Sequence, residues 1–109
     1  MTNKRVRIRD RRVAPRHAVG LELTVLRPKG VVVGGGPGPF EGHCLDISQS
    51  GLRFSSREIF ARREHLTITI YDGGGFAGLR VVAEVVRSQR VSGGYETGCR
   101  FLETLPLQE

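Results

Sequence analysis

The sequence of 109 residues contains no tryptophan, and its five phenylalanines and two tyrosines make up only 6% of the chain. Proteins that bind single-stranded nucleic acid stack bases on exposed aromatic side chains, so this scarcity argues against that function. No run of about 18 apolar residues occurs, which argues against a membrane-spanning helix. No apolar stretch follows the basic N-terminus, which argues against a secretory signal. We therefore expect a cytoplasmic protein.

Residues that would indicate metal binding or catalysis are also scarce. Cys44 and Cys99 have no CxxC partner, so we expect buried free thiols rather than a disulfide or a metal site. The three histidines, His17, His43 and His65, do not have metal-ligand spacing. No Ser/His/Asp set, catalytic carboxylate pair or phosphate-binding loop is visible. The sequence thus predicts a protein that is not an enzyme and uses neither a metal nor a cofactor.

Acidic residues are nearly absent from the N-terminal segment. Residues 1–16 contain seven basic side chains and one acidic one, whereas residues 17–109 contain ten of each, so this segment accounts for the net charge of +6. Six of its seven cations are arginines, whose planar guanidinium matches phosphate and the O6/N7 edge of guanine. A charge run of this kind is either a solvated tail or a binding arm.

The remainder of the chain shows short alternating segments that are separated by glycine-rich turns. This pattern predicts an all-β fold, a small six-stranded antiparallel β-barrel, because closing a sheet removes its exposed edges. Residues 27–39 form a long Gly/Pro-rich loop of unassigned role that includes a short Val31–Val33 strand end, and residues 56–64 could form one or two helical turns with Ile59 and Phe60 as apolar contacts. The predicted strands cover residues 19–26, 40–47, 51–55, 65–71, 78–89 and 95–102.

The stretch LDISQSG, residues 45–51, combines turn chemistry with polar side chains on one face. Strand alternation places Asp46 and Ser48 about 7 Å apart on one side. Leu45 and Ile47 then face the core, so we expect Asp46 and Ser48 on the outer wall. A carboxylate there can accept hydrogen bonds from the N1–H and N2–H₂ edge of guanine. Gly51 would permit a positive φ or the close approach of a ligand, although all three residue types also simply favour turns.

The stretch RRVAPRH, residues 11–17, places Arg12 and Arg16 four residues apart before the first strand. Pro15 disfavours a helical conformation at Ala14, so we expect an extended arm. An extended arm could fold over the outer wall of the barrel. Its arginines and Asp46 would then offer both donors and acceptors to a guanine base.

These two stretches resemble the motifs of PilZ domains. RVAPR matches the family's RxxxR motif, DISQSG matches its [D/N]xSxxG motif, and GCRF at residues 98–101 is similar to its last core strand. The resemblance spans about residues 9–104. It implies a six-stranded β-barrel that binds the bacterial second messenger cyclic di-GMP and performs no catalysis.

The resemblance assigns roles to the five motif residues. It implies that Arg12 and Arg16 hold phosphates and guanine O6/N7, that Asp46 and Ser48 contact the donor edge of guanine and nearby ligand atoms, and that Gly51 provides room. These assignments divide the chain into a flexible basic arm (1–10), a PilZ-like barrel (11–104) and a short tail (105–109).

Three further residues are candidates for the ligand site. Arg11 adds a cation before the motif, and His17 directly follows Arg16. Gly98 could allow a ligand to approach the backbone, although a glycine within a strand more often marks a bulge. The family's usual C-terminal helix is expected to be short or absent here, because Pro106 disfavours it.

The expected mechanism is a ligand-operated switch or adaptor. The dianionic ligand would order the arm at a cost of about 1–2 kcal/mol per residue, which several arginine contacts of about 1.5–3 kcal/mol each could offset. Binding near micromolar, about −8 kcal/mol, is expected, either of one ligand molecule or of an intercalated dimer. The ordered arm would then expose or hide a surface for an unidentified protein partner.

Two alternatives stay open at this point. The first is a PilZ-like interaction module that does not bind ligand. The second is a small nucleic-acid-binding barrel, which the neutral charge of residues 17–109 disfavours. Salt separates the latter from a cyclic di-GMP receptor, because the affinity for a polynucleotide falls more steeply with ionic strength.

Overall fold

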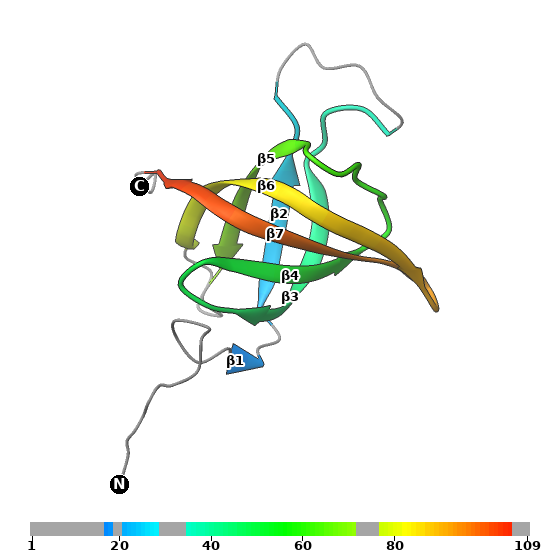
Figure 1. Ribbon diagram of the computed structural model, residues 1–109, viewed down its shortest axis with the longest axis horizontal. Helices are drawn as coiled ribbons and strands as arrows, with labels where there is room; N and C mark the ends of the chain where they lie inside the picture. The colour runs from blue at the N-terminus through cyan, green and yellow to red at the C-terminus, as the bar shows by residue number, and fades with distance from the viewer. Residues whose placement is uncertain (1–16, 19–20, 29–34, 72–76, 106–109) are drawn as a thin grey trace, which may run out of the picture.

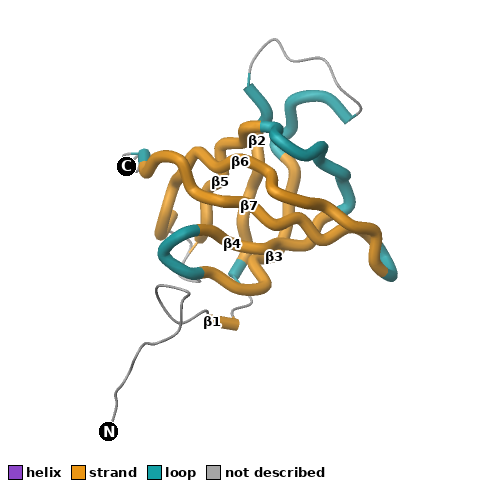
Figure 2. The backbone as a smooth tube through the Cα atoms, in the orientation of Figure 1, coloured by secondary structure: helices purple, strands orange, loops and turns teal. Residues whose placement is uncertain are grey.

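The computed structural model describes residues 17–18, 21–28, 35–71 and 77–105, and these contain strands but no helix (Figure 2). The long segments of alternating apolar and polar residues all form strands, as their periodicity predicts. Val19 and Gly20, the Val31–Val33 segment and the predicted turn at 72–75 lie outside the described residues. The strands are β1 (His17–Ala18), β2 (Glu22–Leu26), β3 (Phe40–Ile47), β4 (Gly51–Ser56), β5 (His65–Tyr71), β6 (Ala77–Val91) and β7 (Gly94–Thr104).

Six of these strands close into an antiparallel barrel, which confirms the predicted fold (Figure 1). The strand order is β1-β3-β2-β5-β6-β7-β4, and an additional pairing between β3 and β4 completes the ring. The short strand β1 lies outside the ring and pairs only with the end of β3. The hairpin of β6 and β7 is longer than the other strands and projects beyond the barrel (Figure 1).

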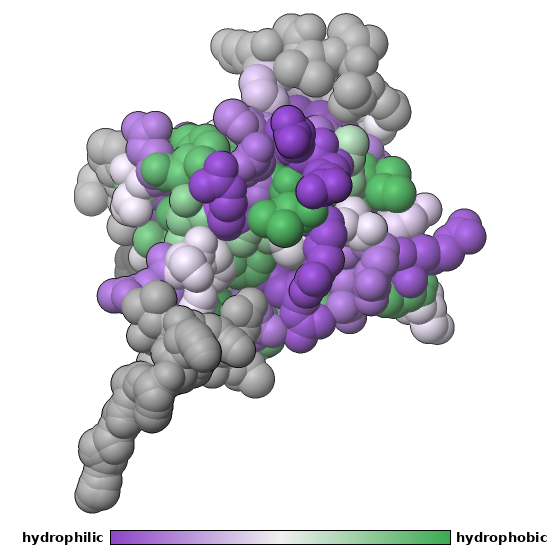
Figure 3. All heavy atoms as spheres, viewed as in Figure 1, coloured by the Kyte–Doolittle hydropathy of each residue, from purple (hydrophilic) through white to green (hydrophobic). Residues whose placement is uncertain are grey.

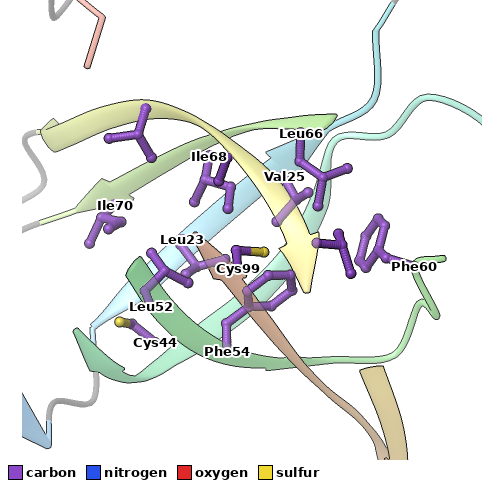
Figure 4. Packing of buried hydrophobic residues seen from close by; sticks show 13 residues of the cluster. Leu23, Val25, Cys44, Leu52, Phe54, Phe60, Leu66, Ile68, Ile70 and Cys99 are labelled. Carbon is purple, nitrogen blue, oxygen red and sulfur yellow. The ribbon is translucent and has the colours of Figure 1, made fainter. Parts of the chain in front are cut away.

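Alternate side chains of every barrel strand meet in one apolar core (Figure 4). Cys44 and Cys99 are buried free thiols, as expected, and burial raises the pKa of Cys44 to about 11 and that of Cys99 to about 12. The fully or nearly fully buried members of the core are Leu23, Val25, Cys44, Leu52, Phe54, Phe60, Leu66, Ile68, Ile70, Val81, Ala83, Val85 and Cys99.

The segment between β4 and β5 is an irregular loop, so the expected helical turns at residues 56–64 are wrong. Ser56 donates a hydrogen bond from Oγ to the carbonyl of Glu58, and Arg63 has a φ of 77°, which a right-handed helix excludes. Phe60 enters the core with 1% of its surface exposed, whereas Ile59 is 53% exposed. Only one of the two predicted apolar contacts therefore forms.

A buried arginine gives the Gly/Pro-rich loop a structural role. The side chain of Arg27 is 2% exposed, and its Nε donates to Glu64 at 2.7 Å while Nη1 donates to Glu58 at 2.9 Å. Nη1 also donates to the carbonyl of Gly36, and Nη2 donates to that of Ile59. Arg27 thereby joins Gly36 of one loop to the β4–β5 loop.

The contacts of Arg27 favour the charged forms of Arg27 and Glu64. Its guanidinium carbon lies 4.7 Å from the ring centre of Phe60 and 5.3 Å from that of Phe40. Hydrogen bonding to Glu64 raises the pKa of Arg27. Burial acts to raise the pKa of Glu64, but hydrogen bonds from Arg27 and from the Ala61 amide, together with the charge of Arg27, lower it overall.

Candidate functional site

The candidate site lies where β3 ends between β1 and β4. Ile47 and Asp46 of β3 pair with His17 and Ala18 of β1 on one side. On the other side Asp46 pairs with Arg53 of β4, so Asp46 belongs to the middle strand of three (Figure 1). The segment that follows the RxxxR motif is thus paired with the strand that carries Asp46 of the DxSxxG motif.

A bulge in β3 determines which side chains point outward here. The register between β3 and β4 shifts between Cys44 and Asp46, which leaves Leu45 as the extra residue. Cys44 lies in the core and Ile47 packs against it, so the expectation that Leu45 and Ile47 share the core face is wrong for Leu45. The shift keeps Asp46 on the outer side despite the buried cysteine two residues earlier.

Asp46 is held by an arginine that the sequence analysis did not assign to the site. Arg53 donates from Nε and Nη2 to Oδ2 of Asp46 at 3.0 and 2.8 Å, and from Nη1 to Oε1 of Glu96 at 2.8 Å. The Asp46 side chain is 14% exposed and that of Arg53 is 38% exposed. The outer wall thus carries a chain of Asp46, Arg53 and Glu96 that is joined by hydrogen bonds, and the bond to Asp46 raises the pKa of Arg53.

The spacing within the β3–β4 hairpin could have predicted the contact between Arg53 and Asp46. Asp46 and Arg53 are seven residues apart across a tight turn, which makes them cross-strand neighbours of opposite charge. Arg53 lies on the outer side of β4, because its neighbours Leu52 and Phe54 are buried. Its pairing with Asp46 could have been inferred from the turn, but its contact with Glu96 depends on the β4–β7 pairing, which the local sequence does not reveal.

Ser48 is buried, which differs from the expected position on the outer wall. Its relative exposure is 9%, and its amide donates to the carbonyl of Gly51 at 2.9 Å. Its hydroxyl lies 3.3 Å from that of Ser50 and accepts a hydrogen bond from the Ser50 amide. In the structure Ser48 therefore serves the turn between β3 and β4, and its contact with a ligand stays a prediction.

Gly51 is required by the packing of the barrel. Its φ is not positive, and a Cβ at this position would overlap the carbonyl oxygen of Cys99 and lie 3.1 Å from Cα of Arg100. β4 and β7 approach each other here more closely than any larger residue allows. The structure thus explains Gly51 by the close approach of β4 and β7, and neither a positive φ nor the approach of a ligand is needed for this explanation.

Gly98 lies opposite a bulge, in agreement with the more common role of a strand glycine. The register between β6 and β7 shifts between Val85 and Arg87, and Arg87 pairs with Gly98. A Cβ on Gly98 would lie 3.7 Å from Cγ of Arg87, an ordinary contact. Gly98 is also the β7 partner of Arg53, so it lies on the same outer wall as Asp46.

A family comparison agrees with the barrel fold. The family model described as PilZ domain matches residues 10–109. The chain belongs to the PilZ domain family. No curated protein matches the sequence. Cyclic di-GMP binding is the known role of the PilZ family, which is a family of binding domains rather than of enzymes.

The structure describes only part of the predicted PilZ site. Arg11, Arg12 and Arg16 lie outside the described residues, and only the backbone pairing of His17 is described. Within the described ranges no group of three acidic, histidine or cysteine side chains could hold a metal ion. Those ranges also contain no helix that is long and apolar enough to cross a membrane.

Proposed function

We propose that this PilZ domain is a cyclic di-GMP receptor whose N-terminal arginines close over the end of β3. The observation that supports this most directly is the pairing of His17 and Ala18 with Ile47 and Asp46, because it brings the chain that follows the RxxxR motif beside Asp46 of the DxSxxG motif. The family's known ligand supplies the chemistry.

Chain geometry allows the motif arginines to reach Asp46. Arg16 is bonded to His17, and consecutive Cα atoms are about 3.8 Å apart. Arg12 precedes His17 by five residues, which span at most about 18 Å when extended. A long arginine side chain adds further reach, so both guanidinium groups can contact a ligand that lies against the end of β3.

In this proposal the outer wall recognises guanine and the arm recognises phosphate. Asp46 accepts hydrogen bonds from the donor edge of guanine and shares its carboxylate with Arg53, which fixes its orientation. Ser48 exchanges its contact with Ser50 for one with the ligand. Arg12 and Arg16, with Arg11 as an additional cation, bind the two phosphates and the O6/N7 edge of guanine.

The output of binding is the ordering of the arm. Fixing each arm residue costs about 1–2 kcal/mol of backbone entropy, and each charge-assisted contact returns about 1.5–3 kcal/mol. Several contacts must therefore form together, which makes the response cooperative and the affinity close to micromolar. The ordered arm alters a surface that a downstream protein can read, so the domain acts as a switch or adaptor.

Titration calorimetry with cyclic di-GMP tests this function. We expect micromolar binding by the wild type, and a loss of affinity of about tenfold or more in Arg16→Ala and Asp46→Ala, since each removes a charge-assisted contact. Arg57→Ala is the matched control, because Arg57 is exposed and its substitution removes one positive charge at a different place on the barrel. Absence of heat from the folded wild type at concentrations well above micromolar would indicate an interaction module instead. Equal binding by all three variants would place the ligand elsewhere on the barrel.

A further inference from the structure

Strand β6 has an open edge beside the β4–β5 loop. Its pairing with β5 ends at Glu84, and two hydrogen bonds with Arg63 and Glu64 extend this side only to Val85. Beyond that point, in the part of the chain that the structure describes, the side of β6 that faces away from β7 has no strand partner over Val86–Val91. An edge of this kind can accept an additional strand.

Two hollows open along the start of this edge. One has a volume of about 460 Å³ and is lined by Ile59, Phe60, Arg62, Val86, Arg87 and Ser88. The other, of about 440 Å³, shares Arg62 and Val86 and continues toward Glu84 and Arg100. We call the first hollow, with the residues that line it, the edge site. The edge site can receive a side chain from a strand that lies beside β6.

The edge site combines exposed aliphatic side chains with positive charge. Ile59 is 53% exposed and Val86 is 45% exposed, and both belong to the small set of large exposed apolar side chains. The two hollows together carry four arginines and one glutamate, a net charge of +3. The glutamate, Glu84, is already bound by Arg100. Apolar patches among hydrophilic side chains are visible on the face that β6 and β7 cross (Figure 3).

We propose that the β6 edge binds an extended acidic segment of a partner protein by β-strand addition, with one aliphatic side chain of that segment between Ile59 and Val86. Backbone hydrogen bonds to Val86–Val91 would supply the pairing, and carboxylates of the segment would contact Arg62 and Arg87. This proposal goes beyond cyclic di-GMP binding and uses a different part of the barrel.

Charge and chemistry favour this occupant over the others. A second copy of the chain would present the same cationic edge, and like charges on paired strands repel each other. A nucleic acid would match the charge, but the only aromatic residue of the edge site, Phe60, is 1% exposed and offers no surface for base stacking. Arginine is instead enriched at protein interfaces, and the exposed side chains of Ile59 and Val86 offer apolar area to a side chain of the partner.

A defined peptide tests the proposal with the whole chain. The probe is a fluorescent peptide of sequence Glu-Thr-Glu-Ile-Glu-Thr-Glu, followed by anisotropy and by amide NMR shifts of the isotope-labelled protein. We expect the shifts to concentrate at residues 86–91 and 59–63. Replacing each Glu of the peptide by Lys, or methylating the backbone nitrogens of alternate residues, should abolish binding, because the first removes the charge complementarity and the second removes the strand hydrogen bonds.

Protein variants separate this site from general charge attraction. Arg62→Glu should weaken peptide binding about tenfold, the loss of one charge-assisted contact, whereas Arg57→Glu should change it less than about twofold. Asp46→Ala should leave peptide binding unchanged, so failure of the cyclic di-GMP proposal and failure of this one are distinguishable. The proposal is overturned if Arg57→Glu and Arg62→Glu weaken binding equally. It is also overturned if the edge amides respond to oligothymidylate or to phosphatidylglycerol vesicles but not to the peptide.

Discussion

Replacing Arg27 by methionine should be one of the most damaging single substitutions outside the apolar core. Methionine keeps the unbranched stem and fills a similar volume. It removes every hydrogen bond that the guanidinium donates to Glu58, Glu64 and the carbonyls of Gly36 and Ile59. Two carboxylates then remain side by side without their shared cation.

The structure sets the size of the effect. Breaking a buried ion pair by removing one partner costs about 3–5 kcal/mol. Since the side chains of Glu58 and Glu64 are 19% and 16% exposed, we take the lower limit, about 3 kcal/mol. That is a large part of the 5–15 kcal/mol by which domains are usually stable, and it corresponds to a decrease in Tm of about 12 °C or more.

The effect should depend on pH because Arg27 lowers the pKa of Glu64. Burial alone acts to raise this pKa, and the hydrogen bonds and charge of Arg27 contribute to its net lowering below the ordinary value of 4.5. A group whose pKa is lowered in the folded state stabilises the protein above its unfolded pKa, and this stabilisation is lost as the pH falls through the folded pKa. The difference in the free energy of unfolding between the wild type and Arg27→Met should therefore have its largest value at pH 7 and decrease below about pH 4.5.

Urea unfolding followed by circular dichroism at several pH values measures this difference. Arg57→Met serves as the control and should cost less than about 0.5 kcal/mol, as exposed substitutions usually do. Adding Glu58→Gln and Glu64→Gln to Arg27→Met should recover part of the loss, because the unpaired charges are then gone. A cost of no more than about 0.5 kcal/mol for Arg27→Met at pH 7, the range of an exposed substitution, would refute this prediction.

Three further predictions concern the core and the motif glycine. Gly51→Ala should lower Tm sharply, because the added Cβ forces β4 away from the Cys99 carbonyl. Thermal unfolding without ligand measures this decrease, and a loss of cyclic di-GMP binding by this variant would then be a consequence of its lower stability. An unchanged Tm would contradict the packing argument. Phe60→Ala should cost about 3–5 kcal/mol in urea unfolding, and the neighbouring Ile59→Ala less than about 1 kcal/mol, and equal costs would refute the assigned burial. Cys44 and Cys99, with pKa values raised to about 11 and about 12, should react with a thiol reagent at pH 8 only after denaturation, and rapid labelling of the native protein would disagree.

Most of the barrel could be predicted because its strands follow simple alternation. Leu66, Ile68 and Ile70 share one face in the sequence and in the structure, and Leu52 and Phe54 do the same. The bulge at Leu45 could not be predicted, since an extra residue in a strand leaves no local signature and only the pairing with β4 reveals it.

The features of the fold and of the site that were missed depend on contacts between distant segments. The apolar pair in the β4–β5 loop looked helical from composition, but Arg27, 32 residues before Ile59, binds that loop through its carbonyl and two glutamates. The constraint on Gly51 comes from the carbonyl of Cys99 on a strand that lies far away in the sequence. The motif residues could be recognised and the Asp46–Arg53 pair could have been inferred from the turn, whereas the contacts of Arg53 with Glu96 and of Gly51 with Cys99 could not.

Amide NMR of the isotope-labelled protein during a titration with cyclic di-GMP tests the central claim most directly. The claim is that the ligand binds where β1 joins the end of β3. The account predicts the largest shifts at His17, Ala18, Asp46, Ile47 and Arg53. It predicts little change at Arg27 and at Glu58 and Glu64, to which Arg27 is hydrogen-bonded. Saturable shifts that leave the β1–β3 junction unchanged and concentrate elsewhere on the barrel would contradict it.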